Sequence, residues 1–128
     1  MSTMEQDLWP KDIEDVDVIA PVAIMKRQAS RLANHTRRLV TADVVSTGSA
    51  DRFDHMFYVR ARTLRYENLL FTVTHSVEMY PLTVLFDGLP QGKGVAETEE
   101  QFVTVLATVL QHPDTQRLIK TLMAQIEV

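Results

Sequence analysis

The sequence predicts a single α+β domain in which helices flank an antiparallel sheet on one face, in the order α-β-β-β-β-α-α. Three observations predict this class. Apolar residues recur at three- and four-residue spacing after Pro21 and again after Thr98, which is the period of a helix. Residues 40–86 instead alternate apolar and polar side chains, which is the period of a strand. A length of 128 residues fits one such domain.

Residues 1–18 are predicted to form an extended acidic arm ahead of a domain that spans residues 19–128. The arm holds six acidic residues against the single base Lys11, and it shows neither helical nor strand periodicity. It also carries Trp9. We expect this side chain to pack against a surface, because an exposed tryptophan leaves a large apolar area in water.

The first helix is predicted from Pro21 to about Val40. Proline fits the first helical turn, where its missing N–H removes no hydrogen bond. Arg37 and Arg38 fall near the predicted end of the helix, where cations favour the negative end of its dipole. One face of this helix is apolar and holds Val22, Met25, Ala29, Leu32 and Ala33.

Four strands are predicted next, as a meander with one buried face. The first covers residues 40–45 and stops at the turn-forming residues 46–49. The second covers residues 53–62, the third residues 69–76 and the fourth residues 80–86. Pro81 cannot donate to a strand ladder, so the fourth strand is expected to lie at an edge or to start after it. Gly88–Gly94 is predicted as a loop. The buried face of the second and third strands is expected to carry Phe53, His55, Phe57, Val59, Ala61, Leu69, Phe71, Val73 and His75.

Two helices are predicted to close the chain. Thr98 and Gln101 form a capping-box pattern at the start of the first, whose apolar stripe holds Phe102, Leu106, Val109 and Leu110. Pro113 ends it, and the last helix starts at about Asp114. This last helix carries a stripe of Leu118, Ile119, Leu122, Met123 and Ile126. Three helices exceed what one face of a four-stranded sheet accepts, so we expect the last helix to cover a second copy and the protein to be a homodimer.

Composition excludes several classes of protein. The chain has no cysteine, which rules out disulfides, thiolate nucleophiles, iron–sulfur clusters and cysteine-type zinc sites. The first residues lack the features of a secretory signal, and no apolar run is long enough to span a bilayer, so a cytoplasmic protein without a membrane partner or cofactor is expected. Residues 26–65 hold nine bases against three acids. We expect this basic region to be neutralised within the fold or across a subunit contact.

His55 and His75 are the candidate site on the apolar face. If the second and third strands form a hairpin centred near residues 64–65, these histidines lie opposite each other. Facing imidazoles bind metals or act as an acid–base pair. No carboxylate shares the face to complete a zinc site, and a register shifted by one residue separates the rings. We therefore interpret them as neutral, hydrogen-bonded core histidines, and we predict no metal site and no catalytic residue.

Tyr58, Arg60 and Arg62 are the candidate ligand-binding residues of the opposite, open face. Aromatic and arginine side chains on an open sheet stack single-stranded bases in some proteins. One tyrosine falls short of such platforms, and an isoelectric point near 5.5 opposes nucleic-acid binding. A phosphate loop is also excluded at Gln91–Gly94, where the required glycine–lysine spacing is absent.

The leading hypothesis is a non-enzymatic protein-binding or accessory module. An alternative is a small-ligand binder or enzyme that uses the His55/His75 face. A weaker alternative is nucleic-acid binding through Arg60 and Arg62. The order of a helix, a meander and further helices resembles that of small bacterial secretion chaperones, which are acidic dimers. Many unrelated functions share such folds, so this resemblance implies a topology and not an activity.

Overall fold

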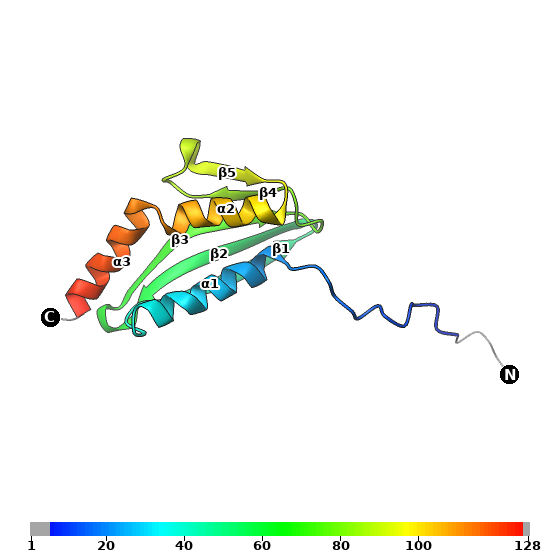
Figure 1. Cartoon of the computed structure of the whole chain (residues 1–128), viewed down its shortest axis with the longest axis horizontal. Helices are drawn as coiled ribbons and strands as arrows, with labels where there is room; N and C mark the ends of the chain where they lie inside the picture. Colours follow the sequence, from blue (N-terminus) through cyan, green and yellow to red (C-terminus); the bar gives the residue numbers. More distant parts are fainter. Residues whose placement is uncertain (1–5, 127–128) are drawn as a thin grey trace.

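The computed structural model describes residues 6–126, and this part of the chain forms three helices and one five-stranded antiparallel sheet (Figure 1). The helices are α1 (Pro21–His35), α2 (Glu99–Leu110) and α3 (Pro113–Ile126). The strands are β1 (Thr41–Ser49), β2 (Arg52–Ala61), β3 (Tyr66–His75), β4 (Leu82–Leu85) and β5 (Lys93–Ala96), and they pair in chain order. The α+β class is confirmed, with five strands in place of four. Within residues 6–126, no helix has the length and apolar character needed to cross a bilayer.

The additional strand is β5, which sequence reasoning assigned in part to a loop. Gly94 lies in this strand, opposite Val84 of β4. A Cβ atom at Gly94 would lie 3.3 Å from the side chain of Val105 on α2. The close passage of α2 over the sheet thus explains a glycine inside a strand. As expected, the fourth strand starts after Pro81, although β5 keeps it from being an edge.

Two predicted ends differ from the observed ones. The first helix ends at His35, where the buried Thr36 hydroxyl contacts backbone on both sides of it. Thr36 Oγ1 lies 3.0 Å from the Leu32 carbonyl and 2.8 Å from the Val40 carbonyl, and it accepts from the Val40 amide (3.2 Å). Arg37 and Arg38 follow with positive φ angles, outside the helix. The residues predicted to form a turn after the first strand instead continue β1 to Ser49, paired with β2.

The pairing of β2 with β3 keeps the predicted faces over most of its length. His55 lies opposite Val73, and His75 opposite Phe53, which is two residues from the predicted pairing of 55 with 75. A shift of two residues leaves every side chain on its face, because the period of a strand is two. A β-bulge follows Phe57, and it reverses the prediction for two leucines. Leu69 is 43% exposed beside Tyr58, whereas Leu70 faces the helices.

The core lies between the sheet and the helices. Phe57 and Phe71 are each 1% exposed and directly opposite in the register, and their rings stack with centroids 4.8 Å apart. Their predicted position at the centre of the core is confirmed. Met25 and Ala29 from α1 and Phe102, Leu106 and Val109 from α2 complete this layer.

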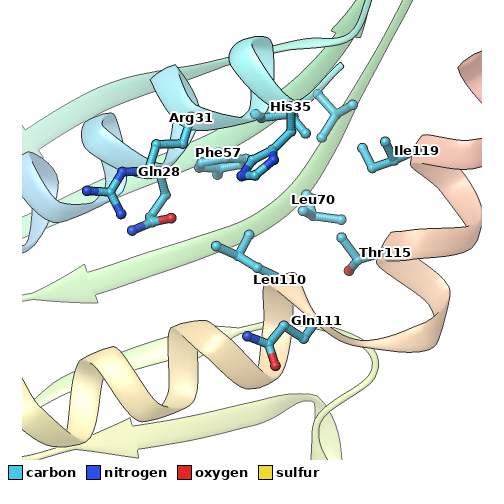
Figure 2. Close-up of a pocket in the computed structure, with 11 residues that line it drawn as sticks. Gln28, Arg31, His35, Phe57, Leu70, Leu110, Gln111, Thr115 and Ile119 are labelled. Atoms are coloured by element: carbon cyan, nitrogen blue, oxygen red, sulfur yellow. The ribbon is translucent and has the colours of Figure 1, made fainter. Parts of the chain in front are cut away.

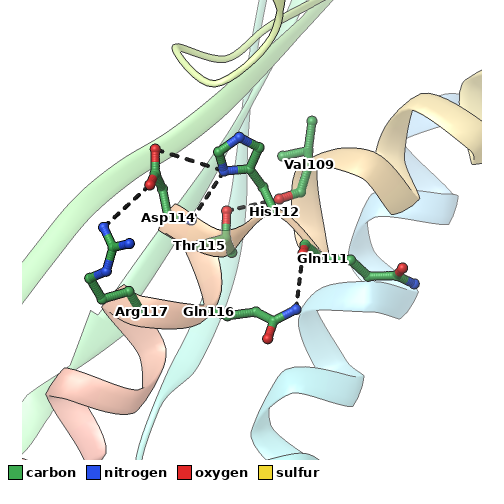
Figure 3. Close-up of polar contacts among 7 residues, drawn as sticks. All are labelled: Val109, Gln111, His112, Asp114, Thr115, Gln116 and Arg117. Atoms are coloured by element: carbon green, nitrogen blue, oxygen red, sulfur yellow. Dashed lines mark hydrogen bonds and ion pairs between the residues drawn. The ribbon is translucent and has the colours of Figure 1, made fainter.

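The last helix packs on its own chain and not on a neighbour alone. Leu122 is buried, and the other apolar residues of the α3 stripe are half-buried against the core. Polar contacts fix the corner between α2 and α3 (Figure 3): the Thr115 hydroxyl donates to the Val109 carbonyl at 2.8 Å, and the Gln116 amide donates to the Gln111 carbonyl at 2.9 Å. The α3 stripe therefore packs in part on its own chain, and whether it also covers a second copy stays a prediction.

The start of α2 provides a first testable prediction. Thr98 Oγ1 accepts a hydrogen bond from the Gln101 amide (3.1 Å), and Gln101 Oε1 accepts one from the Glu97 amide (2.8 Å). We expect Thr98→Ala to lower the free energy of unfolding by about 1 kcal/mol, because an N-terminal amide loses its partner. Urea unfolding measures this change. Thr104→Ala, an exposed threonine inside the same helix, is the control and should be neutral or slightly stabilising. Equal losses in both variants would contradict the capping role.

Candidate functional site

The structure brings His55 and His75 together on the buried face of β2 and β3. Their Nε2 atoms are 2.8 Å apart, although the residues are diagonal neighbours in the register. The outer ring nitrogens are also partnered. His75 Nδ1 lies 2.6 Å from the Ser76 carbonyl, and His55 Nδ1 lies 2.7 Å from the Ser46 hydroxyl of β1. His55 is only 6% exposed.

These contacts define where the protons lie. A carbonyl oxygen only accepts, so His75 Nδ1 carries a proton and, in the neutral ring, Nε2 is an acceptor. His55 then donates from Nε2, and its Nδ1 accepts from the Ser46 hydroxyl. One additional proton fits on His55 Nδ1, with the hydroxyl reversed. Two additional protons do not fit, because both Nε2 atoms would then carry hydrogens that point at each other.

The electrostatics favour the neutral state of His55. Burial lowers the pKa of His55, the nearby His75 and Lys26 lower it further, and Asp54 partly opposes them. The pKa of Asp54 is itself held below its usual value, first by the hydrogen bond from the Thr74 hydroxyl at 2.8 Å and then by Arg52. The result is a neutral His55 beside an ionised surface carboxylate.

The Ser46–His55–His75 chain has the order of a nucleophile, a base and an orienting group. Chemistry at Ser46 also requires a cavity for a substrate. The fold has an apolar groove between its helices, described below, and neither Ser46 nor the two histidines line it. Among residues 6–126, no cluster of three or more potential ligands could hold a metal. The geometry fits satisfied core histidines.

The open face of the sheet differs from its prediction. Tyr58 and Arg60 lie on β2, but Arg62 does not share their face, because β2 ends at Ala61 and Arg62 begins a short 3₁₀ helix. Arg60 is neutralised by two carboxylates: its Nη1 lies 2.9 Å from Asp43 on β1, and its Nε lies 3.0 Å from Glu67 on β3. The three candidates therefore do not form a cationic platform.

A groove of about 260 Å³ lies between α1 and the α2–α3 corner (Figure 2). Phe57, Val59 and Leu70 from the sheet form its floor. Leu32, Leu110 and Ile119 contribute apolar walls from the three helices, and the polar rim consists of Gln28, Arg31, His35, Gln111 and Thr115. We call this cavity the helix groove.

The second exposed feature is the predicted arm, whose irregular backbone continues two residues beyond the predicted boundary, to Ala20. The arm, from here on residues 6–20, forms no helix or strand and leads away from the start of α1 (Figure 1). Its backbone turns at Pro10–Ile13 and Asp12–Asp15, with amide-to-carbonyl distances of 3.2 and 2.9 Å. Trp9 is 73% exposed, so the expectation that it packs is wrong within one chain. Six large apolar side chains of the arm are 38–85% exposed: Leu8, Trp9, Ile13, Val16, Val18 and Ile19.

Comparisons with protein-family models, with curated proteins and with solved structures find no match for this chain. A function is therefore inferred from the surfaces of the molecule itself.

The helix groove was not predicted from the sequence, and the arm was predicted from its acidic residues but without the role of its apolar ones. The groove is built from three helices and from a bulge that turns Leu70 toward them, and no local periodicity encodes that spacing. The arm was recognised by its charge. Its apolar residues are also visible in the sequence, alternating with acids between Ile13 and Ile19, and they were the available signal for a binding segment.

Proposed function

We propose that the protein is a non-enzymatic protein-binding module that acts as a homodimer. The exposed apolar side chains of the arm carry this proposal. Burying a large apolar side chain stabilises a state by about 1.5–3 kcal/mol, and the arm exposes six such side chains between Leu8 and Ile19. A protein surface that accepts the arm removes this area from water.

The other candidate functions have weaker support. A small-ligand site is expected to have a volume of roughly 300–1,000 Å³, and the helix groove has about 260 Å³. Enzymatic use of His55 and His75 has weaker support because neither histidine lines the helix groove. Nucleic-acid binding through Arg60 conflicts with the two carboxylates that pair with it.

Sedimentation equilibrium tests the proposal. We expect the full chain to be a dimer at micromolar concentration, with an interface that buries more than ~1,000 Å². A variant with Leu8, Trp9, Ile13 and Val16 all changed to serine should be a folded monomer. Val77→Ser is the control, because Val77 is as exposed as Trp9 (72% against 73%) but lies outside the arm. A wild-type chain that stays monomeric at high concentration and captures no purified partner contradicts the proposal.

A further inference from the structure

We propose that the arm of one copy docks in the helix groove of a second copy, with Trp9 as the anchor and the acidic side chains of the arm on the basic face of α1. This inference rests on the proposed function, because it names the surfaces through which two copies bind.

The helix groove matches a side chain better than a cofactor. Its volume of about 260 Å³ has an apolar floor and walls, which fits one or two large apolar groups. Trp9 is the largest exposed apolar side chain in residues 6–126. Tryptophan is enriched among residues that dominate binding interfaces, because it buries about 150–250 Å² and carries an N–H that finds partners at a polar rim. Gln28 and Gln111 supply such partners at the groove.

Charge complementarity supports the same pairing. Lys26, Arg27 and Arg31 on α1 are exposed, and no carboxylate within residues 6–126 lies at ion-pair distance from them. Arg31 and His35 stand on the groove rim (Figure 2), and Arg27 lies one helical turn before Arg31 on the same ridge.

The arm presents the opposite sign. Asp12, Glu14, Asp15 and Asp17 are exposed, and in the described part of the chain no basic side chain pairs with them. Acids and apolar residues alternate here, as expected for a segment that lies along a basic rim and inserts side chains into an apolar groove. The acidic arm and the basic face of α1 are thus two surfaces of opposite charge on the same chain, and the arm of one copy can pair with α1 of another.

The path of the chain favours a second copy over the arm's own groove. The groove lies beside the C-terminal half of α1, whereas the arm leaves the N-terminal end and points away from the sheet (Figure 1). A return requires a reversal at Ala20, which is extended (φ −71°, ψ 146°) and followed by the fixed φ of Pro21. In a two-fold pair, each arm reaches the groove of the other copy without that reversal.

Trp9 is the only tryptophan in the chain, so its fluorescence reports docking directly. We expect dilute wild-type protein to show the red-shifted emission of a solvent-exposed indole. Titration with excess Trp9→Ala chain, which has an open groove and no tryptophan, should shift this emission to the blue. Trp9→Ala should also weaken self-association roughly 30-fold or more, the effect of a strong interface residue.

Acceptor variants identify the docking surface. A Trp9→Ala chain that also carries Arg27→Glu and Arg31→Glu should bind roughly 10-fold more weakly or worse, since like charges now face the arm. Lys93→Glu and Lys120→Glu, which reverse charges on β5 and on α3, form the matched control and should bind as the parent acceptor does. Changing Asp12 and Asp15 of the arm to lysine should restore binding to the glutamate acceptor.

Each contrary result has a distinct meaning. A sedimenting dimer whose Trp9 emission stays red, or whose acceptor charges do not matter, overturns groove docking but leaves the proposed dimer intact. Blue emission that is independent of concentration and of added acceptor shows that the arm occupies its own groove. Absence of both the dimer and the emission shift refutes the proposed homodimer together with this inference.

Discussion

Replacing Phe57 by alanine is expected to lower the free energy of unfolding by about 3–5 kcal/mol. Phe57 is 1% exposed and stacks on Phe71 at the centre of the core. Its truncation removes the transfer free energy of the ring, and the surrounding side chains refill the space only in part. A loss of this size is a large part of the total stability of a domain, which is roughly 5–15 kcal/mol.

Phe71→Ala should be the more damaging of the two substitutions. Phe57 borders the helix groove, so the space left by its ring joins a cavity that is already open at the rim. Phe71 is 1% exposed and does not line that groove, so we expect the space left by its ring to be more enclosed. We therefore expect a loss near 3 kcal/mol for Phe57→Ala and nearer 5 kcal/mol for Phe71→Ala, because the loss grows with the residual cavity.

Urea unfolding monitored by circular dichroism measures both losses. Tyr58→Ala is the matched control, because Tyr58 is the next residue of β2 on the opposite, open face. It should cost clearly less than either phenylalanine. If Tyr58→Ala lowered the free energy of unfolding as much as Phe57→Ala does, the open face would be covered, and the assignment of Phe57 to the core and Tyr58 to the open face would not explain the stability of the domain.

The sequence predicts elements whose signal is local. The stripes of α1 and α2, the cap at Thr98 and the buried parity of Phe57 all follow from spacing within a few residues. The prediction is wrong where contacts between residues far apart in the sequence determine the local structure. The β-bulge at Leu70 depends on how β3 meets β2. Gly94 lies in a strand because it pairs with Val84 of β4, and a Cβ atom there would lie only 3.3 Å from the Val105 side chain of α2. Such pairings have no periodicity that a sequence displays.

The candidate residues show the same division. His55 and His75 share a face because strand parity is local, and the pairing shift of two residues preserves it. Arg60 and Arg62 do not share a face, since the strand ends one residue too early. The neutralisation of Arg60 by Asp43 and Glu67 joins three strands, so only the assembled sheet reveals it.

The free energy of unfolding is expected to fall as the pH drops below about 6.5, the ordinary pKa of histidine. Burial, the nearby His75 and Lys26 lower the pKa of His55 in the folded chain. Between the unfolded and the folded pKa, the unfolded chain therefore binds a proton that the folded chain does not. Stability rises with pH wherever the unfolded state binds more protons, so it declines on acidification through this window.

The size and the end of this decline also follow from the histidine pair. One proton gives a slope of at most about 1.4 kcal/mol per pH unit, and the slope vanishes below the folded pKa of His55. Urea unfolding at a series of pH values measures it. His55→Gln should flatten the slope between neutral pH and pH 5, since the titrating ring is gone. Thr104→Ala is the control and should keep the wild-type slope, because it changes an exposed side chain and removes no titratable group. A His55→Gln slope equal to that of the wild type would show that the decline has another origin, and the neutral state inferred for His55 would lose its support.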